Sequence, residues 1–425
     1  MKVLIITYYW PPAGGSGVQR WLKFVKYLRD FDIEPIIYTV DNPEYVIEDE
    51  SLLAEIPEGV EVIRQPIFEP NSILSFLGKK NKKQSSGFLN PNPGAFGKLL
   101  QYIRANYFIP DARKYWVRPS VEYLEQYIKS NNVDTIISTG PPHSMHLIAK
   151  QLKQRLGVKW ISDFRDPWTD IDYFHQLPLS KKSKTKHLEL EEQVVSKSDA
   201  VVVVGETMRL NFKKYNNSIH VITNGYDSEV SAVNEKLDTY FTITHIGMMN
   251  ADRNPAVLWQ VLKEICDENI DFKKDLKVQL IGNVAAEVKK SLGILDEKNV
   301  AFIGYLDHQK ARSYQQRSQV LLLAINNVPS AKGIITGKIF EYLQAKRPIL
   351  GIGPVDGDAA DIINETESGI MIDFDDALRL KETIVTYYQK FKEGVLTASS
   401  GNIEKYHRKE LTRELSVILK SQITQ

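Results

Sequence analysis

The sequence is poor in cysteine and has no long apolar runs. Its single cysteine, Cys266, excludes an internal disulfide and is typical of a reducing compartment. No run of about 18 apolar residues occurs, so we expect no segment that spans a bilayer. The apolar start at residues 1–6 is too short for a signal peptide. We therefore expect a cytoplasmic protein whose membrane contacts are at most peripheral.

The chain has almost no net charge and shows no metal-binding pattern. The 54 basic and 53 acidic residues leave a formal net charge of +1, which gives no general reason to expect nucleic acid as a partner. No set of His, Asp and Glu residues has the spacing of metal ligands. We therefore expect no metal and no cofactor, and a metal-dependent hydrolase is disfavoured.

The sequence is rich in short apolar runs that alternate with amphipathic helical patterns. Its 425 residues, 43% hydrophobic and 25% charged, are typical of a globular protein with two domains. Residues 2–7 and 34–40 have the pattern of buried parallel strands, joined by a helical segment that starts near Val18. The alternation resumes after residue 134 and again at residue 241. We therefore predict an α/β fold with two Rossmann-like domains.

The predicted domains are residues 1–230 and 236–400, because residues 227–239 are polar and unpatterned. The first domain contains an insertion at about residues 68–118, where the alternation breaks. The last helical segment, residues 402–421, is a candidate to pack back on the first domain.

The first predicted strand is followed by a loop rich in proline and glycine, residues 8–17, that carries Gly14 and Gly15. Exposed amides at the start of the next helix would bind an anion or let a sugar approach the backbone closely. The dinucleotide-binding fingerprint needs a third glycine, and Arg20 stands at that position. The loop therefore disfavours a nicotinamide site.

The stretch from Val320 to Gly353 pairs a clear strand with a helix that carries a candidate ligand-binding residue. Residues 320–325 predict a buried parallel strand, and a polar loop, residues 326–337, precedes a helix at residues 338–346. Parallel sheets bind ligands beyond the carboxyl ends of their strands, where this loop and helix start would lie. Glu341, one turn inside the helix, is therefore a candidate ligand-binding carboxylate. The alternative, a solvated glutamate with a lysine neighbour, stays open.

Two further groups of polar residues follow predicted strands of the first domain. Asp163, Arg165 and Asp166 come directly after one strand, and such charges are costly to bury unless they meet one another or a ligand. His143 and His146 follow another strand, close to a helix start. A lone histidine in that position is more often a cap or a packing residue than a functional group.

The insertion contains a group of four lysines, the lysine cluster, which consists of Lys79, Lys80, Lys82 and Lys83. A helical segment at residues 96–107 follows and mixes apolar with basic side chains. This combination is typical of a peripheral protein that contacts an anionic membrane. The alternative, a surface insertion with a solvated charge run, is the more common case.

Four features occur in a fixed order along the chain. They are the Gly14–Gly15 loop, the turn from Asn224 to Asp227, the loop from Gly247 to Arg253 and the helix from Phe340 to Pro348. In this order and spacing they resemble the retaining glycosyltransferases of the GT-B fold, in the large glycosyltransferase family 4 group. The resemblance spans nearly the whole chain. It implies two Rossmann-like domains that face each other across a crevice.

The resemblance implies a nucleotide diphosphate sugar, with UDP as the expected nucleotide, bound mainly by the second domain. Glu341 takes the family's position for the carboxylate that accepts both ribose hydroxyls. Arg253 and Lys338 match positions that face the diphosphate, where fixed cations neutralise the leaving group without a metal. Arg165 and Asp166 are the nearest polar candidates for contact with donor sugar or acceptor, and Asp166 joins the two cations as a candidate catalytic residue. The remaining candidates for donor binding are Gly14, Gly15, Asn224, Gly247, Gly304, Tyr305, Leu306, Thr336 and Gly337.

Three places depart from the family pattern, and one is the end of the strand at residues 159–162, where the segment from Asp163 to Trp168 replaces the family's histidine. Ile334 stands where the family commonly has a glutamate beside the donor sugar, and Met248 or Met249 stands where an arginine usually follows Gly247. These departures leave two alternatives open. One is a catalytically weak GT-B subunit that binds a nucleotide sugar or a partner. The other is a sugar-nucleotide epimerase on the same fold, which would need acid and base residues that the sequence does not identify.

The reaction implied by the resemblance is retaining transfer of a sugar to an acceptor hydroxyl. A departing phosphate oxygen that helps to deprotonate the acceptor on the same face would make an enzymic nucleophile unnecessary. The expected acceptor is a saccharide or a lipid-linked saccharide in bacterial surface-polysaccharide synthesis. A lipid-linked acceptor would lie in the membrane, so an enzyme that uses it would need to contact the inner face of the membrane.

Overall fold

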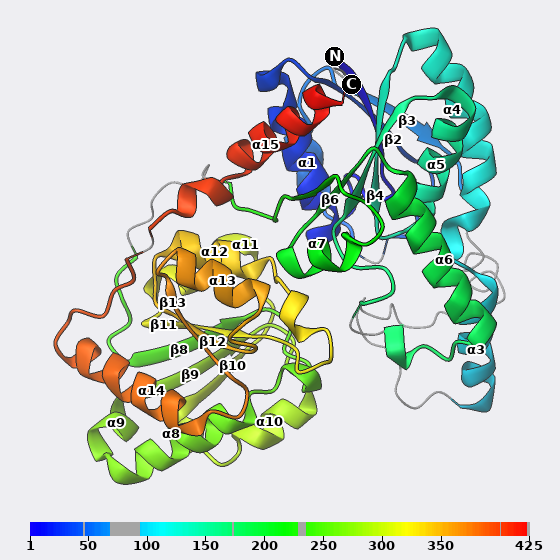
Figure 1. Cartoon of the computed structure of the whole chain (residues 1–425). Helices are drawn as coiled ribbons and strands as arrows, with labels where there is room; N and C mark the ends of the chain where they lie inside the picture. The colour runs from blue at the N-terminus through cyan, green and yellow to red at the C-terminus, as the bar shows by residue number, and fades with distance from the viewer. Residues whose placement is uncertain (46, 69–93, 172–173, 228–234, 400, 423–425) are drawn as a thin grey trace. The chain divides into compact units, whose positions relative to one another are not determined.

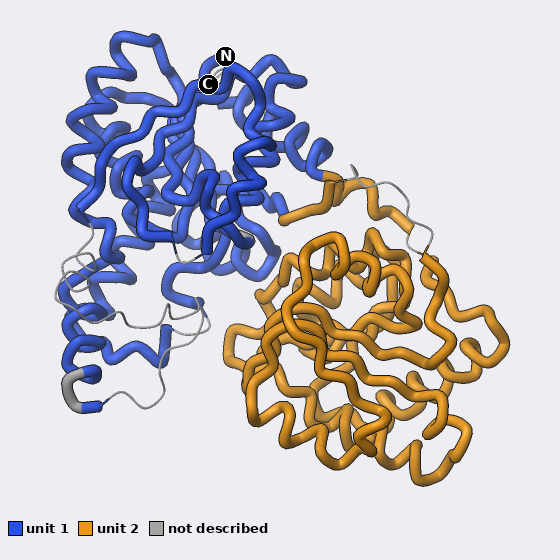
Figure 2. The backbone as a smooth tube through the Cα atoms, turned by 180° about the vertical axis from the view of Figure 1, so that it is seen from behind, with its two compact units in different colours: residues 1–223, 408–425 blue, residues 224–407 orange. Residues whose placement is uncertain are grey.

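Parallel sheets organise both halves of the chain in the computed structural model. The structure describes residues 1–45, 47–68, 94–171, 174–227, 235–399 and 401–422. The chain divides into unit 1, residues 1–223 with 408–425, and unit 2, residues 224–407 (Figure 2). Each unit holds one sheet with helices packed against it (Figure 1). The predicted α/β fold with two Rossmann-like domains is therefore confirmed.

The described residues of unit 1 form a seven-stranded parallel sheet in the order β3-β2-β1-β4-β5-β6-β7. The strands are β1 Lys2–Ile6, β2 Glu34–Val40, β3 Glu61–Gln65, β4 Thr135–Gly140, β5 Lys159–Phe164, β6 Ala200–Val203 and β7 Ile219–Val221. The central strand β1 is apolar on both faces because helices cover both, and Val3, Leu4 and Ile5 are fully buried. In register, Val3 lies between Pro35 of β2 and Thr135 of β4.

The described helices of unit 1 pack around its sheet, with one exception. The helices are α1 Ser16–Leu28, α3 Ala95–Tyr107, α4 Val117–Asn131, α5 Ser144–Leu156, α6 Lys181–Lys197, α7 Glu206–Phe212 and α15 Arg408–Ser421. The exception is α3, which packs against α6. In α1, Val18, Leu22 and Val25 recur at helical spacing and are all fully buried. The last helix, α15, packs beside α1 (Figure 1), with Leu415 and Leu419 in the core of unit 1.

The described residues of unit 2 form a six-stranded parallel sheet in the order β10-β9-β8-β11-β12-β13. The strands are β8 Phe241–Ile246, β9 Leu276–Ile281, β10 Val300–Ile303, β11 Val320–Ala324, β12 Ile349–Ile352 and β13 Gly369–Ile372. The helices are α8 Ala256–Glu268, α9 Ile270–Asp275, α10 Ala286–Leu292, α11 His308–Arg317, α12 Lys338–Ala345, α13 Asp358–Glu365 and α14 Ala377–Lys392. Figure 1 shows α11, α12 and α13 on one face and α8, α9, α10 and α14 on the other.

Strand β11 lies inside the sheet of unit 2, and its position explains why the sequence from Val320 to Ala324 is apolar without interruption. Val320 and Leu322 belong to the apolar cluster with α8 and α14, whereas Leu321 and Leu323 belong to the cluster with α12 and α13. Because helices cover both faces of this strand, both sets of side chains have to be apolar.

The insertion in unit 1 is described only in part. Helix α3 confirms the helix predicted at residues 96–107, but the lysine cluster lies outside the described residues. Within the ranges that the structure describes, no helix combines the length and the apolar character needed to cross a membrane.

Candidate active site

The loops that follow β8 and β11 leave adjacent strands at the carboxyl edge of the unit 2 sheet. From these two strands the sheet grows outward in both directions, to β9 and β10 on one side and to β12 and β13 on the other. They therefore form the topological switch point, where parallel sheets bind their ligands. The polar side chains of these two loops and of α12 make up the candidate site.

Lys338, the first residue of α12, reaches to the end of β8. Its ammonium nitrogen lies 3.4 Å from Nε2 of His245, a fully buried residue of β8. A Cβ atom at Gly247 would lie 2.9 Å from that nitrogen and would collide with the lysine stem, and Gly247 has a φ of 117°. Glycine alone meets both demands. Burial, and to a smaller extent the charge of Arg253, lower the pKa of Lys338 to about 7, while the charge of Glu341 acts against both.

Arg253 ends a short helical turn, Ala251–Arg253, in the loop after β8. Its Nε donates to Oδ1 of Asn326 over 2.9 Å, and its Nη1 donates to the carbonyl of Met248 over 3.0 Å. Asn326 follows β11 and is almost fully buried. These bonds tie the two loops of the switch point together and fix the direction of the guanidinium.

Glu341 lies one turn further along α12 than Lys338. Its Oε2 accepts a hydrogen bond of 2.8 Å from Nε2 of Gln315, a buried residue of α11. Arg312, also on α11, is near enough for the two charges to attract each other, while burial lowers the pKa of Arg312. The carboxylate of Glu341 is thus oriented by an amide that has no charge.

The start of α12 is fixed to the sheet but carries no side-chain cap. The phenol of Tyr342 accepts a hydrogen bond of 3.1 Å from the backbone N–H of Ile246, at the end of β8. Gly337 stands at the cap position without a capping side chain, and the hydroxyl of Thr336 is buried without a hydrogen bond within the described structure. The backbone N–H groups at the start of α12 thus have no side-chain cap, and the hydroxyl of Thr336 lies close to them in sequence.

Ile334 packs with Ile335 against the apolar cluster beneath α12. The residue that replaces the family's glutamate is therefore part of the packing around the loop. The structure offers a physical reason for an apolar side chain here, since the cluster gains buried area from it.

The other predicted residues of unit 2 lie elsewhere in the fold. Gly304, Tyr305 and Leu306 follow β10, the edge strand two places from β8, and Tyr305 is 91% exposed. They share the carboxyl edge of the sheet with Lys338, at a distance of two strands. Asn224 is the first residue of the unit.

In unit 1, the glycine loop after β1 is braced by residues 47–49. The N–H of Gly14 donates to the carbonyl of Ile47 over 2.9 Å, and the N–H of Asp49 donates to the carbonyl of Pro12 over 2.8 Å. Gly15 has a φ of 83° and directly precedes α1. The N–H of Gly14 is therefore used within the protein, and it lies ahead of the amides at the start of α1 that the sequence predicts as ligand-binding.

Asp163 and Arg20 form an ion pair inside unit 1. Their closest atoms are 2.8 Å apart, and each side chain is 1% exposed. The carboxylate also accepts hydrogen bonds from Trp21 and Thr139, and the guanidinium donates to the carbonyl of Ile222. Arg20 therefore occupies the third position of the broken glycine fingerprint as a core residue with a complete set of partners.

Arg165 and Asp166 follow β5 but have different surroundings. The guanidinium of Arg165 donates to the carbonyls of Gly17 and Pro141 and lies 5.6 Å from the ring centre of Tyr9. Burial lowers the pKa of Arg165, against the charge of Asp166. Asp166 is exposed. Arg165 thus joins the loops after β1 and β4, while Asp166 is open to solvent.

His143 and His146 are packing residues, as the more common interpretation predicts. His146 is fully buried, with Nδ1 2.8 Å from the hydroxyl of Ser138. His143 stacks on Trp168 with 4.5 Å between ring centres. Burial lowers the pKa of His146 to about 3 and that of His143 well below its usual value, so both rings are neutral at physiological pH.

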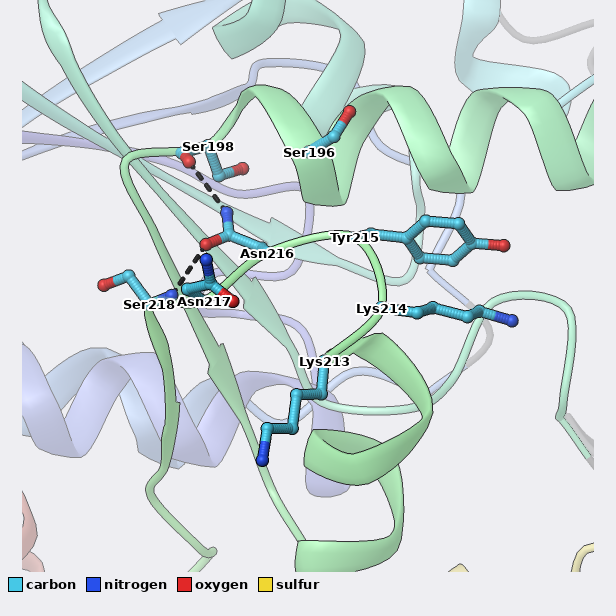
Figure 3. Close-up of a pocket in the computed structure, with 8 residues that line it drawn as sticks. All are labelled: Ser196, Ser198, Lys213, Lys214, Tyr215, Asn216, Asn217 and Ser218. Carbon is cyan, nitrogen blue, oxygen red and sulfur yellow. Dashed lines mark hydrogen bonds between the residues drawn. The ribbon is translucent and has the colours of Figure 1, made fainter.

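A surface pocket of about 370 Å³ lies in unit 1, where β6 and β7 begin (Figure 3). It is lined by Ser196, Ser198, Lys213, Lys214, Tyr215, Asn216, Asn217 and Ser218. The amide of Asn216 donates to the carbonyls of Val195 and Ser198 and accepts from the N–H of Ser218. The pocket is at the amino-terminal ends of the strands, the edge opposite the loops that bind ligands in such sheets. We therefore interpret this pocket as a feature of the turn that Asn216 stabilises, and not as a ligand site.

Three residues of the unit 2 site have no counterpart in the sequence prediction: His245, Asn326 and Gln315. His245 is the one titratable side chain of strand β8, Phe241–Ile246, and this was the cue that could have identified it. Asn326 and Gln315 have no such cue, because their importance comes from contacts with residues that are distant in sequence.

Two family models match the chain. Residues 88–230 match the model described as Glycosyltransferase Family 4, and residues 240–390 match the model described as Glycosyl transferases group 1. The second match contains both loops of the switch point and all of α12. No curated protein matches the chain.

Solved structures share the fold over the whole chain. A glycosyltransferase from Rickettsia africae ESF-5 is 14% identical with a TM-score of 0.62, and the likeness covers 99% of this chain and 98% of that one. A mutant of S. aureus TarM, in complex with Fondaparinux, alpha-GlcNAc-glycerol and UDP, is 12% identical with a TM-score of 0.59. The likeness covers 97% of this chain and 98% of that one. WaaG, a glycosyltransferase involved in lipopolysaccharide biosynthesis, is 11% identical with a TM-score of 0.56, and the likeness covers 98% of this chain and 99% of that one.

Structures described as UDP-N-acetylglucosamine 2-epimerases share the fold too, so likeness at these identities establishes the architecture alone. The two family matches divide the chain as the two sheets do, one match in each unit. The chain belongs to the GT-B glycosyltransferases, in the family 4 and group 1 type.

Proposed function

We propose that the protein transfers a sugar from a nucleotide diphosphate sugar to an acceptor hydroxyl, with retention of configuration and without a metal. The observation that carries the proposal is the group of Arg253, Lys338 and Glu341 at the switch point of unit 2. Two cations beside one oriented carboxylate match the two polar parts of a nucleoside diphosphate, its phosphates and its ribose diol.

Glu341 is the proposed ribose ligand. Gln315 uses one acceptor position on Oε2, and a carboxylate has about four such positions, so capacity remains for both ribose hydroxyls. Hydrogen bonds to a charged group contribute about 1.5–3 kcal/mol. The backbone from Gly304 to Leu306 is proposed to face the base, and Gly247, Thr336 and Gly337 to border the phosphates.

Arg253 and Lys338 are proposed to stabilise the leaving diphosphate. Negative charge grows on this group as the glycosidic bond breaks, so fixed cations stabilise the transition state more than the bound donor. Asn326 and Met248 hold the guanidinium of Arg253 in place, which limits the reorganisation needed during the reaction. A metal ion would have no essential task beside these two cations.

The acceptor is proposed to attack from the face that the diphosphate leaves. A phosphate oxygen can then take the acceptor's proton, and no enzymic nucleophile is needed. In unit 1, the exposed carboxylate of Asp166 and the guanidinium of Arg165 are the proposed contacts to acceptor or donor sugar. Gly14, Gly15 and Asn224 remain proposed neighbours of the donor.

The proposed donor is a UDP-sugar and the proposed acceptor is a saccharide or a lipid-linked saccharide of a bacterial surface polysaccharide. The S. aureus TarM structure with UDP supports the nucleotide, and WaaG, described as involved in lipopolysaccharide biosynthesis, supports the acceptor class. Nucleotide sugars are the substrates, so the proposed location is the cytoplasm.

A panel of UDP-, GDP- and ADP-sugars tests the proposal, with each donor incubated with the full chain and released nucleoside diphosphate measured. We expect release with at least one donor, even without acceptor, as slow hydrolysis. Binding without release would favour the catalytically weak subunit. Conversion of one sugar nucleotide into an isomer without release would favour the epimerase. No binding of any donor would overturn the proposal.

We further propose that the protein contacts the inner face of an anionic membrane through α3. Leu99, Tyr102 and Tyr107 on this helix are 54%, 45% and 66% exposed, and Lys98 and Arg104 lie on the same helix. An apolar helical face flanked by basic side chains fits the boundary between headgroups and acyl chains. The lysine cluster would add about 1 kcal/mol per lysine near such a surface.

Co-sedimentation with vesicles that contain anionic lipid tests this second proposal at low and high salt. We expect wild type to sediment at low salt, and weaker binding after the lysine cluster is changed to glutamine. A matched variant carries the same change at four lysines outside the insertion: Lys184, Lys289, Lys290 and Lys310. Equal loss in both variants, or no binding by wild type, would contradict a contact through this region.

A further inference from the structure

Lys338 sits in surroundings that are unusual for a lysine. The end of its side chain lies over Gly247, where a Cβ atom would displace it, and its nitrogen is 3.4 Å from Nε2 of His245. In the part of the chain that the structure describes, no carboxylate forms an ion pair with Lys338. The side chain is half-buried, so an ammonium there has lost part of its hydration, and the charge of Glu341 compensates for this loss only from beyond ion-pair distance.

The ring of His245 acts as an acceptor toward Lys338 in the tautomer that carries its hydrogen on Nδ1. Its Nδ1 lies 3.1 Å from the carbonyl oxygen of Leu322, which accepts and cannot donate, so Nδ1 carries the hydrogen. Burial and the charges of Lys338 and Arg253 hold the pKa of His245 well below its usual value, although the carbonyls of Leu322 and Met248 act against them. The ring is therefore neutral, and Nε2 offers its lone pair to the lysine.

The charged groups that face Lys338 come from several elements. His245 is on β8, Arg253 is in the loop after β8, and Glu341 is on α12 itself. Behind Glu341, Arg312 on α11 partly offsets the charge of that carboxylate. The free protein therefore has little that stabilises a charged Lys338, whereas a bound diphosphate would place negative charge beside it.

We propose that Lys338 takes up a proton when a diphosphate binds, so that donor binding itself completes the cationic site. This rests on the proposed function, which supplies the diphosphate as ligand. The neutral amine in the free protein gains one proton from the solvent and becomes an ammonium that donates to His245 and to a phosphate oxygen. His245 is a positioning residue, because its lone pair holds the nitrogen over Gly247 in both states.

The coupling makes donor affinity depend on pH in one direction. Above the pKa of about 7 in the free protein, each bound diphosphate has to be accompanied by a proton. Affinity for UDP is therefore expected to fall by more than about tenfold between pH 7 and pH 9. UDP does not cause this fall, because its terminal phosphate, with a pKa of about 6, is already ionised there.

Titration calorimetry of the full chain with UDP at pH 8, in buffers of different ionisation enthalpy, measures the protons taken up. We expect about one proton per bound UDP in wild type. Lys338→Arg keeps a permanent cation, so UDP binding should persist with no proton uptake and with little change in affinity between pH 7 and pH 9. If Lys338→Arg fails to fold, Lys338→Met provides the same comparison, again with uptake lost.

Two variants of His245 separate positioning from packing. His245→Gln retains an acceptor near the place of Nε2, whereas His245→Leu removes it at similar size. We expect the fall of UDP affinity between pH 7 and pH 9 to be near that of wild type for glutamine and steeper for leucine. Equal pH profiles in both folded variants would remove His245 from the proposal.

The outcomes also separate this inference from the proposed function. UDP binding without proton uptake at pH 8, or uptake that persists in Lys338→Arg, overturns the inference and leaves the glycosyltransferase proposal standing. Failure to bind UDP, GDP or ADP in any form removes the basis of both.

Discussion

Unit 1 has a fully buried basic side chain in Arg20 and unit 2 a half-buried one in Lys338, and the two have different kinds of partner. In unit 1, Arg20 and Asp163 are an ion pair with both side chains 1% exposed. In unit 2, Lys338 has the neutral ring of His245 as its hydrogen-bond partner and the like charge of Arg253 nearby. The first arrangement is complete within the protein. The second costs stability unless an anion joins it.

Burial of a charge therefore does not by itself identify a functional site. Charged residues follow strands in both units, and in the sequence they look equivalent. What separates them is the partner, because Asp163 is neutralised by Arg20 and further bonded by Trp21 and Thr139. We expect substitutions in the complete network to affect folding, and substitutions in unit 2 to affect mainly ligands.

Asp163→Asn is expected to have the largest effect. Removing the charge leaves Arg20 buried without its counter-ion, which costs about 3–5 kcal/mol. Urea denaturation measures this loss. Asp41→Asn makes the same change at an exposed position directly after β2 of the same unit, and it should change stability by less than about 0.5 kcal/mol. Similar denaturation midpoints for the two variants would erase the contrast between the units.

Arg253→Ala is expected to lower turnover by about 100-fold, because stabilisation of the leaving group is lost in the transition state. The affinity for UDP should change less than kcat does. Steady-state release of nucleoside diphosphate from the preferred donor is the measurement, with Arg379→Ala, exposed on α14, as the control. Unchanged turnover in folded Arg253→Ala would exclude the residue from the mechanism.

Glu341→Gln is expected to weaken UDP binding by about 1.5–3 kcal/mol, the contribution of hydrogen bonds to a charged acceptor. Calorimetry with UDP gives the value directly. Glu382→Gln on α14 makes the same chemical change at an exposed position and should leave affinity unaltered. If both variants bind UDP as wild type does, the solvated-glutamate interpretation of Glu341 is correct.

Lys338→Met is expected to stabilise the protein slightly, and more at pH 6 than at pH 9. The unfolded chain holds the lysine proton up to a pH of about 10.4, whereas the folded protein releases it near pH 7. The cost of a charged Lys338 is therefore fully present below pH 7 and falls as pH rises toward 10. Denaturation midpoints at the two pH values test this, with exposed Lys290→Met as control. A gain in stability of Lys338→Met that is equal at pH 6 and pH 9 would contradict the explanation that the cost comes from the charge of Lys338.

Much of the fold could be predicted because its signals are local. The run from Val320 to Ile325 predicted β11, since a strand covered on both faces has no polar side. The position of Glu341 followed from the strand, loop and helix order around it. Both depend on residues that are neighbours in sequence.

The parts that could not be predicted depend on pairings across long sequence distances. Nothing in the sequence shows that the N–H of Gly14 donates to the carbonyl of Ile47. The role of Arg20 depends on Asp163, which lies 143 residues further on. The role of His245 depends on Lys338, which lies 93 residues further on and was identified without its partner.

A crystal structure of the full chain with UDP decides whether the switch point of unit 2 is the donor site. We expect diphosphate oxygens within hydrogen-bonding distance of Arg253 and Lys338, at the carboxyl ends of β8 and β11, with the ribose hydroxyls on Glu341. A nucleotide bound elsewhere, for instance at the pocket beside Asn216 in unit 1, would contradict this assignment.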